Sequence, residues 1–258
     1  MRKNLIYKFK NSFANEGILI ATLKIIKYPI NVFRKNKFKN EILSIESIED
    51  RFTWIYKNNY WRSGESASGT GSTLKCTENL RKELPGLFRT YSIKKIFDAP
   101  CGDFNWMSHL LPVIEVEYIG GDIVRELIDD LNSRYKSKNV SFVGFDLIKE
   151  IPPEADLMIC RDCLFHFSYK DAKAVLENFV ESKIAYLLTT THKNSGGSFV
   201  NANISTGDFR YIDLFSHPYN FPANPLCVIE DWIAPDPERQ MCLWSREQIV
   251  LALRSFQL

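Results

Sequence analysis

The sequence lacks several patterns that would assign it to a functional class directly. No Gly-Lys-Ser/Thr follows a glycine-rich loop, which excludes a phosphate-binding P-loop. The six cysteines are scattered, without the spacing of a disulfide framework. Cys160 and Cys163 form a Cys-x-x-Cys, but they straddle the end of a predicted strand and no second ligand pair lies nearby. We therefore expect reduced thiols and no metal site.

Long apolar runs are also missing. No uninterrupted run reaches the roughly 18 residues that a membrane-spanning helix requires. The most apolar stretch, residues 17–33, is interrupted by Lys24, Lys27 and Pro29. It lies within a basic segment, residues 1–40, which is compatible with a helix on an anionic membrane surface. A helix that packs on the domain or on a second subunit is the alternative, and we favour it.

The charge is unevenly distributed along the chain. The net charge is +2, but residues 1–40 hold ten Lys and Arg and a single acid, so the remaining residues carry about −7. An acidic body argues against binding of nucleic acid by the main domain. No secretory signal is recognisable, and we expect a cytoplasmic protein for which peripheral membrane contact through residues 1–40 is open. The sequence does not indicate an oligomeric state.

Length and patterning predict one sizeable α/β domain. The 258 residues are 45% hydrophobic and 25% charged, as in ordinary globular proteins. Short apolar runs alternate with helix-like segments from Ser92 onward, which indicates a doubly wound, mostly parallel sheet. Two runs near the end, 226–232 and 239–244, favour a closing antiparallel strand pair.

The domain organisation follows from these patterns. We expect a basic N-terminal helical extension and a main domain that contains a lid region, with helices, and a substrate-side insert. The expected ranges are 1–45 for the extension, 46–258 for the main domain, 46–91 for the lid region and 192–225 for the insert.

The most informative stretch is residues 96–107, Ile-Phe-Asp-Ala-Pro-Cys-Gly-Asp-Phe-Asn-Trp-Met. An apolar strand ends in Asp98, a tight turn carries Gly102, and Asp103 precedes a helix-like segment. This order is typical of a nucleotide-type cofactor loop, in which the end of a strand meets the start of a helix.

The loop does not suit a dinucleotide. Of the three glycines of Gly-x-Gly-x-x-Gly only the second is present, as Gly102, while Pro100 and Asn105 replace the others. We expect Asp103 to cap the helix, where its charge would repel a pyrophosphate. A cofactor without phosphate and with a positive sulfonium suits the loop better, and S-adenosylmethionine is such a cofactor.

Four features in register resemble the class I S-adenosylmethionine-dependent methyltransferases. They are the loop at 98–102, with Pro100 in place of the family's first glycine; Tyr118-Ile-Gly-Gly-Asp122; Val140-Ser-Phe-Val-Gly-Phe-Asp146; and Ala155–Cys160 running into Arg161–His166. Together they cover about residues 90–192. The resemblance implies a seven-stranded Rossmann-like sheet and S-adenosylmethionine as cofactor.

The resemblance also implies the cofactor residues. Asp122 would accept from the ribose hydroxyls, and Asp146 would contact the adenine amino group. A Gly/Ser/Thr-rich loop at 62–73 is expected to close over the cofactor. The complete expected set is Trp61, Ser66, Thr70, Gly71, Asp98, Ala99, Pro100, Gly102, Asp122, Ile123, Asp146, Leu147 and Arg161.

Three side chains after the fourth and fifth strands are candidate catalytic residues. His166 is a candidate base because its ordinary pKa lies near neutrality. Asp162 would orient that imidazole, bind the acceptor or act as base itself. His192 ends the fifth strand, at the edge where open α/β sheets bind ligands.

The insert mixes aromatic side chains with Asp, Asn and Arg, a combination that suits a polyol. Arg210 is a candidate for a phosphate or carboxylate of the acceptor, with Tyr211, Asp213 and Asn220 beside it. An aromatic lid without ligand specificity is the alternative. The loop sequence resembles methyltransferases of bacterial surface-polysaccharide pathways, which implies a sugar or phosphosugar acceptor.

The function predicted is O-methylation of a small or glycan-linked acceptor. No Asn/Asp-Pro-Pro-Tyr/Phe of the amino-group methylases follows the fourth strand, which favours oxygen. A small-molecule N-methyltransferase is one alternative. A Rossmann dehydrogenase is another, and it would require glycines at positions 100 and 105. A non-catalytic scaffold with the same fold is the remaining alternative, and Pro100 is the feature in its favour.

Overall fold

The computed structural model describes residues 40–61 and 63–257. The chain divides into two compact units, Met1–Ile45 and Glu46–Leu258. The basic segment is expected to be a helical extension, for which membrane contact is open. Residues 1–39 of this segment lie outside the described residues. Among the residues that are described, no helix combines the length and the apolar character needed to cross a membrane.

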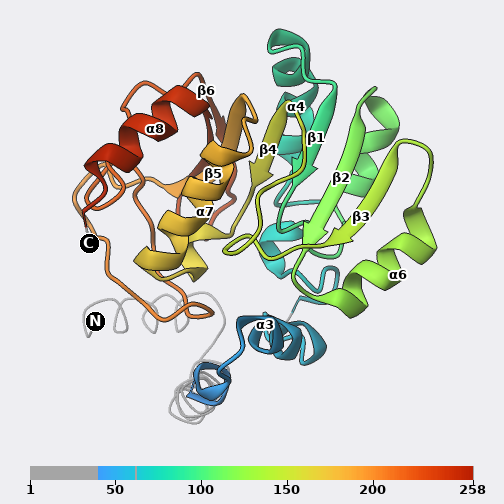
Figure 1. Cartoon of the computed structure of the whole chain (residues 1–258), viewed down its shortest axis with the longest axis horizontal. Coiled ribbons are helices and arrows are strands. Elements are labelled where there is room, and N and C mark those ends of the chain that lie inside the picture. The colour runs from blue at the N-terminus through green and yellow to red at the C-terminus, as the bar shows by residue number, and fades with distance from the viewer. Residues whose placement is uncertain (1–39, 62, 258) are drawn as a thin grey trace, which may run out of the picture. The chain divides into compact units, whose positions relative to one another are not determined.

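A seven-stranded sheet in the order β3-β2-β1-β4-β5-β7-β6 forms the centre of the second unit (Figure 1). The strands β1 to β5 are parallel, whereas β7 is antiparallel to both β5 and β6. The doubly wound sheet and its closing antiparallel pair are therefore confirmed. The strands are β1 (Lys95–Asp98), β2 (Glu117–Asp122), β3 (Val140–Gly144), β4 (Leu157–Cys160), β5 (Tyr186–His192), β6 (Cys227–Glu230) and β7 (Arg239–Ser245).

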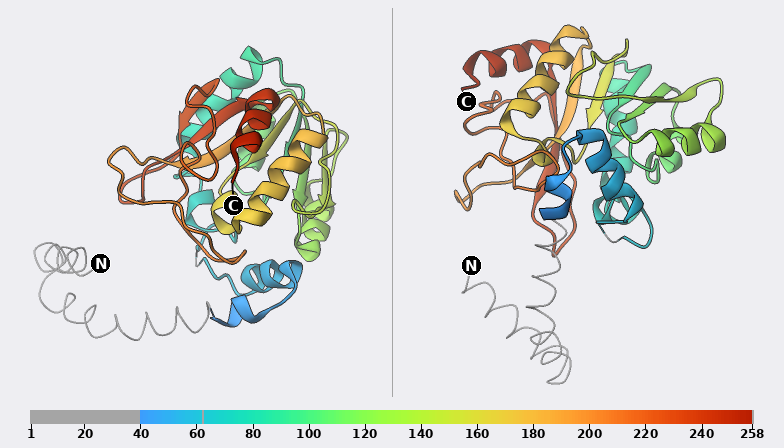
Figure 2. Two further views of the ribbon diagram at one scale, coloured as in Figure 1. Left: turned by 60° about the vertical axis from the view of Figure 1, so that its left-hand side comes forward. Right: turned by 60° about the horizontal axis from the view of Figure 1, so that its bottom comes forward.

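Alternating side chains of the buried strands supply two hydrophobic cores, one on each face of the sheet. In β1, Ile96 belongs to one core and Phe97 to the other, because successive strand residues point to opposite faces. Helices α4 (Glu78–Thr90), α5 (Met107–Leu110) and α6 (Arg125–Tyr135) cover the Ile96 face. Helices α7 (Tyr169–Glu181) and α8 (Arg246–Ser255) cover the Phe97 face (Figure 2).

The carboxyl ends of the parallel strands meet at one edge of the sheet. Register places Asp98 opposite Gly120 and Asp122 opposite Gly144, so Asp122 lies two residues further toward this edge than Asp98. Helix α3 (Ile48–Lys57) lies beyond this edge (Figure 1). Short 3-10 turns complete the unit: η1 (Thr70–Ser72), η2 (Leu111–Val113) and η3 (Leu164–His166).

The expected helix after the cofactor loop begins later than the sequence predicts. Phe104 has a positive φ of 60°, which takes the chain out of helical conformation, and α5 starts only at Met107. The Phe104 ring packs edge-on against Phe142 in the core, with centroids 5.0 Å apart. Burial of this ring therefore shortens the helix, and Asp103 does not cap it.

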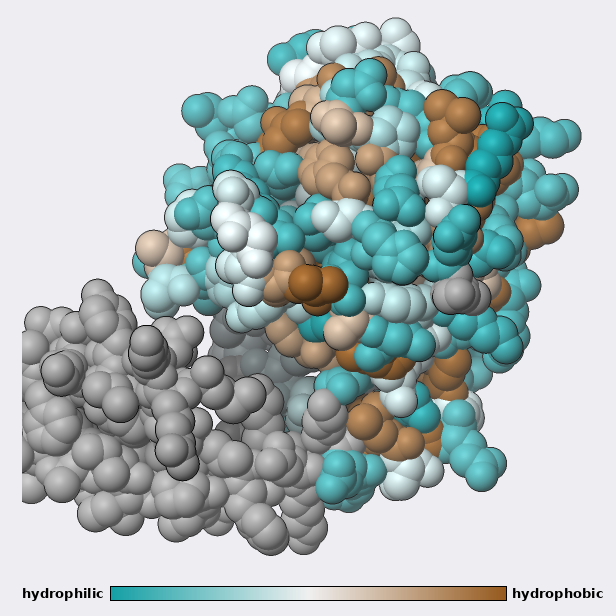
Figure 3. Space-filling model, turned by 90° about the vertical axis from the view of Figure 1, so that its left-hand side faces the viewer, coloured by the Kyte–Doolittle hydropathy of each residue, from teal (hydrophilic) through white to brown (hydrophobic). Residues whose placement is uncertain are grey.

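Residues 193–226 contain no helix or strand in the described structure and form the connection between β5 and β6. Buried Ile212, Leu214, Tyr219 and Phe221 attach this insert to the core on the α7–α8 side. On the side of the molecule where α8 lies, the described surface carries hydrophobic side chains in small groups among hydrophilic ones (Figure 3). The insert is thus part of the packed domain.

Candidate functional site

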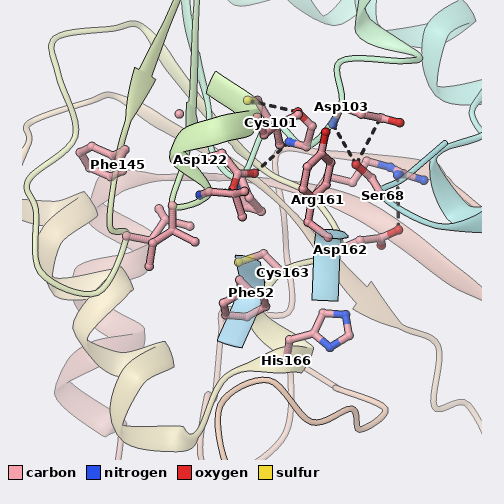
Figure 4. A pocket seen from close by; sticks show the side chains of 18 of the residues that line it. Phe52, Ser68, Cys101, Asp103, Asp122, Phe145, Arg161, Asp162, Cys163 and His166 are labelled. Carbon is pink, nitrogen blue, oxygen red and sulfur yellow. Dashed lines mark hydrogen bonds and ion pairs between the residues drawn. The ribbon is translucent and has the colours of Figure 1, made fainter. Parts of the chain in front are cut away.

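A cavity open to solvent lies at the carboxyl edge of the strands, with about 1070 Å³ of empty space. Part of this space is open solvent. Its lining comes from α3, the 63–73 loop and the segments after β1, β2, β3 and β4. Phe145 and His166 lie on opposite sides of it in the close-up (Figure 4).

Asp98, at the end of β1, is a buried acid on the cavity wall, 2% exposed. The Tyr118 hydroxyl donates to its Oδ2 at 2.8 Å. Burial raises the pKa of Asp98 to about 7, and the Tyr118 hydrogen bond and the nearby Arg161 charge offset this only in part. The carboxyl is therefore close to half protonated at neutral pH.

Asp122, at the end of β2, is connected to the loop after β1. Gly102 N–H donates to its Oδ2 at 3.1 Å, and Val124 N–H donates to its Oδ1 at 3.0 Å. The side chain lines the cavity. Burial raises the pKa of this carboxyl, whereas the backbone donors lower it. Such a carboxylate can accept from two adjacent hydroxyls.

Asp146 lies two residues beyond β3 and shapes the turn that follows. Its Oδ1 accepts from Ile148 N–H at 3.0 Å, and its Oδ2 lies 2.9 Å from Lys149 Nζ. Phe145 and Leu147, both 7% exposed, flank it and line the cavity. The result is an apolar slot with one acid at its edge, suited to a flat heterocycle.

The loop at 63–73 lies against the loop after β1. The Asp103 carboxylate accepts from Ala67 N–H at 2.7 Å, from Ser66 Oγ at 3.0 Å and from Ser68 Oγ at 3.2 Å. Asp103 N–H in turn donates to Ser68 Oγ at 2.9 Å. Asp103 therefore holds the two loops together, in place of the helix-capping role expected of it.

The expected cofactor residues of this loop have different locations. Trp61 lines the cavity, whereas Ser66 is buried against Asp103 and Thr70 is exposed. Gly71 is adjacent to the ion pairs after β4, since a Cβ there would meet Asp162 Oδ2 at 2.8 Å. Ala67, Ser68 and Ser72 line the cavity instead. The residues of this loop are nearly all small, so the sequence does not show which of them face the cavity. The fold shows it.

Elsewhere, the expected residues Pro100, Gly102, Ile123, Leu147 and Arg161 line the cavity. Ala99 does not, because it is fully buried beneath the loop and donates its N–H to Ile159 O at 2.9 Å. We did not expect lining from α3, which contributes Ile48, Phe52 and Tyr56. The near-helical spacing of these residues in the sequence predicts a helix with an apolar face. It does not show whether that face lines a cavity or packs in the core.

A buried group of two arginines and two aspartates lies beside the cavity. Arg161 makes a bidentate hydrogen bond to Asp231 through Nε and NH2, at 2.9 and 3.0 Å. Its NH1 lies 3.3 Å from Asp162 Oδ2. Arg239 NH2 lies 3.2 Å from the same Asp162 oxygen. Asp231 and Arg239 come from the β6–β7 hairpin and were not among the residues expected from the sequence.

This group sets the charge state of Asp162. Burial by itself would raise the pKa of the carboxyl, but the Arg161 and Arg239 guanidiniums outweigh it and hold the pKa below its ordinary value. Thr190 Oγ1 lies 3.3 Å from Asp162 Oδ1 and accepts from Asp162 N–H at 2.8 Å. A carboxylate so stabilised is a poor proton acceptor, which departs from the expectation that Asp162 acts as a base.

His166 lies in η3 at the cavity wall, between the rings of Trp61 at 5.8 Å and Phe165 at 4.6 Å. Its Nδ1 is 2.8 Å from the carbonyl oxygen of Asp208. Because a carbonyl only accepts, Nδ1 carries the proton and Nε2 keeps its lone pair. Burial lowers the pKa of His166, so the imidazole is neutral at pH 7. The Asp208 backbone orients this ring, a role that we expected for Asp162.

His192, at the end of β5, is buried and held in the other tautomer. Ile212 N–H donates to its Nδ1 at 3.2 Å, so the proton of the neutral ring is on Nε2. Burial lowers the pKa of His192 to about 4. The ring packs against Tyr211 at 5.1 Å and does not line the cavity. At pH 7 it is a hydrogen-bond donor and not a base.

The expected acceptor residues of the insert mostly point elsewhere. Arg210 is buried, hydrogen bonds through NH2 to Leu164 O at 3.3 Å and to Tyr219 Oη, and stacks on Tyr169 at 5.0 Å. Asp213 accepts from the insert itself, including Ser216 Oγ at 2.7 Å. These contacts attach the insert to the domain, and binding of the acceptor by Arg210 and Asp213 stays a prediction.

Asn220 Nδ2 donates to the carbonyl oxygen of Ser255, at the end of α8, at 3.2 Å. Asn220 therefore also attaches the insert to the domain. Tyr211 alone of the four expected residues joins the rings beside His192, and its side chain is 42% exposed. Within the described part of the chain, no group of three or more His, Cys, Asp or Glu could hold a metal ion.

Comparison with known proteins identifies the fold. No family model and no curated sequence matches the chain. Among solved structures, magnesium protoporphyrin IX methyltransferase from Synechocystis PCC 6803, with bound SAM, is similar at a TM-score of 0.52 and 11% identity. The match covers 79% of this chain and 99% of that one.

Two further structures agree. The methyltransferase domain of bacterial CtHen1 has a TM-score of 0.50 and 14% identity, over 66% of this chain and 98% of that one. PigF, solved with SAH, has a TM-score of 0.50 and 12% identity, and the match covers 66% of this chain and 56% of PigF. Identities this low show the fold alone. The chain has the Rossmann-like fold of the class I S-adenosylmethionine-dependent methyltransferases.

Proposed function

We propose that the protein is an S-adenosylmethionine-dependent methyltransferase that O-methylates a small or glycan-linked acceptor, a sugar or phosphosugar of bacterial surface-polysaccharide synthesis. The observation that carries the proposal is one cavity bordered by Asp98, Asp122 and Asp146, with a neutral His166 on its far side. The solved structures of the same fold with bound SAM or SAH support the choice of cofactor.

The donor and acceptor groups of the cavity fit this cofactor. The Asp122 carboxylate on the cavity wall would accept from a ribose diol, and Phe145 and Leu147 would contact the adenine. Five carboxyl side chains and one guanidinium line the cavity, a balance that favours a cationic sulfonium and ammonium. Arg161 is the one Lys or Arg among the described lining residues, and its guanidinium is paired with Asp162 and Asp231.

The chain's own residues supply positioning and proton removal. When bound, S-adenosylmethionine supplies a methyl group activated by the positive sulfur. His166 Nε2 would take the proton of the acceptor hydroxyl, because the Asp208 carbonyl keeps the other ring nitrogen protonated. The 63–73 loop, joined to Asp103, would cover the cavity and limit the access of water.

Two further parts of the proposal concern partners. We infer that the main domain does not bind nucleic acid, because residues after 40 carry about −7. For residues 1–40 we favour packing on the domain or on a second subunit, and contact with an anionic membrane surface is the alternative. Equal sedimentation with anionic liposomes of the full chain and of a chain that starts at residue 41 would contradict that contact.

Titration calorimetry with S-adenosylmethionine and S-adenosylhomocysteine tests the cofactor. We expect micromolar binding to the full chain and a loss of about 10- to 100-fold in Asp122→Asn, since a hydrogen bond to a charged group contributes about 1.5–3 kcal/mol. Asp129→Asn, on the exposed side of α6, is the matched control. Failure of folded protein to bind either ligand would favour the scaffold alternative.

A further inference from the structure

A cluster of six rings lies on the far side of the cavity from Phe145. We call it the ring cluster: Trp61, Phe165, His166, His192, Phe209 and Tyr211. Phe209 connects its members, with centroids 5.9 Å from His166, 6.4 Å from His192 and 5.5 Å from Tyr211.

Two members of the ring cluster are unusually exposed for their size. The Phe209 side chain is 50% exposed and the Tyr211 side chain 42%, although both contact buried rings. The backbone holds them in place: Arg210 N–H, between them, donates to Phe165 O at 3.2 Å, and Gly207 N–H donates to His166 O at 2.8 Å. The exposed faces are therefore fixed beside His166.

Three of the described cations near the ring cluster are paired with carboxylates. Arg161 and Arg239 are paired with Asp162 and Asp231. Lys193, which follows His192, lies 2.5 Å from Glu230.

The Arg210 side chain is buried and stacks on Tyr169 and Tyr219, and its Nε and NH1 have no hydrogen-bond partner among the described residues. Both histidines of the ring cluster are neutral at pH 7, because burial lowers their pKa values. The neighbouring cavity is rich in carboxylates, which repel a phosphate.

We propose that the ring cluster is the acceptor subsite and that it binds an uncharged ring bearing a hydroxyl group. This inference rests on the proposed function. It narrows the class of acceptors, because it excludes phosphosugars. Flat faces at Trp61, Phe209 and Tyr211 stack on the ring, and His166 Nε2, which keeps its lone pair because Nδ1 donates to Asp208 O, receives the hydroxyl's proton. The uncharged ring is a hexose or a phenol.

The test uses the full chain saturated with S-adenosylhomocysteine, with ligand contacts measured by saturation-transfer NMR. The probes are methyl hexopyranosides, the same sugars as 1-phosphates, and simple phenols. We expect saturation transfer to uncharged rings, with dissociation constants at least about tenfold lower than for the matching phosphates, since a favourable stack contributes about 0.5–1.5 kcal/mol and carboxylates oppose the anion. Whether hexosides or phenols bind distinguishes the two sources of the ring.

Single substitutions test the residues. Phe209→Ala and Tyr211→Ala are expected to weaken the best uncharged probe by about 3- to 10-fold and to leave the affinity for S-adenosylhomocysteine unchanged. Val200→Ala, in the same insert and 86% exposed, is the matched control. Because Phe209 and Tyr211 are half exposed, neither change should impair folding.

The outcomes separate the two proposals. Three results would overturn the ring-cluster proposal alone, in protein that binds S-adenosylhomocysteine. They are tighter binding of the phosphates than of the uncharged rings, unchanged affinity of both variants for the uncharged probe, and no contact with any uncharged ring. Protein that is folded but binds no S-adenosylhomocysteine would overturn the proposed function, and the acceptor subsite with it.

Discussion

His166 and His192 are fixed as opposite tautomers by the same insert. The carbonyl of Asp208 accepts from His166 Nδ1, and the N–H of Ile212 donates to His192 Nδ1. The two rings both contact Phe165, at 4.6 and 5.4 Å. One imidazole therefore offers a lone pair at Nε2 and the other a proton, although both are neutral histidines from the same side of the sheet.

The titration of the two rings is the first prediction. Burial lowers the pKa of His166 below 6.5 and that of His192 to about 4, so each ring takes up a proton only as the pH falls below its own value. Proton NMR of the ring Hε1 resonances, assigned with His166→Gln and His192→Gln, measures both midpoints. A midpoint above 6.5 for His166 would contradict the geometry.

Turnover gives the second prediction, once an acceptor is known. His166→Gln is expected to lower kcat by about 10²- to 10⁴-fold, the usual contribution of a general base. In the unchanged protein, kcat should fall as the pH drops through the lowered pKa of His166 and level off above it, because only the neutral ring accepts a proton. Full turnover in His166→Gln would remove this residue from the mechanism.

Asp98 leads to a prediction about stability. Its pKa rises from 3.8 to about 7 on folding, mainly through burial, so the folded chain binds more protons than the unfolded chain between these values. The contribution of this carboxyl to the free energy of unfolding should then be largest at low pH and fall by up to about 4 kcal/mol as the pH rises from 4 to 8. Urea unfolding of Asp98→Asn at pH 5 and pH 8 isolates this contribution, which the variant should lack.

The buried ion pairs beside the cavity give a fourth prediction. Asp231→Asn removes one of the two buried carboxylates that partner Arg161 and Arg239 and should lower the free energy of unfolding by about 3–5 kcal/mol. Glu238→Gln, exposed in the same hairpin, is the control and should change it by less than about 0.5 kcal/mol. Equal urea midpoints for the two variants would argue against the role given to Asp231.

Gly102 supplies the fifth prediction. Its φ is +54°, and an added Cβ would meet Ser68 Cβ at 3.0 Å and its Oγ closer still. Gly102→Ala should therefore displace the 63–73 loop and speed amide hydrogen exchange in the peptide that contains Ala67, whose N–H donates to Asp103. Gly196→Ala, with open space around its Cα, should leave that exchange unchanged.

The sequence by itself determined the strands and the acids that end them. Apolar runs followed by Asp98 and Asp122 are local patterns, and parallel strands bring their carboxyl ends to one edge whatever the rest of the chain does. The order of alternating strands and helices was sufficient to predict a doubly wound sheet. Asp146 and His166 reached the cavity wall for the same reason.

Only the tertiary structure decided which side chains pair across long separations. Asp231 meets Arg161 70 residues away because β6 and β7 are added to the sheet beside β5, and no spacing in the sequence encodes that contact. Arg210 could have faced a ligand, but its stacking on Tyr169 and Tyr219 depends on how the insert folds back over α7. Local patterns set strands and turns, whereas the partners of buried charges depend on the packing of the whole domain.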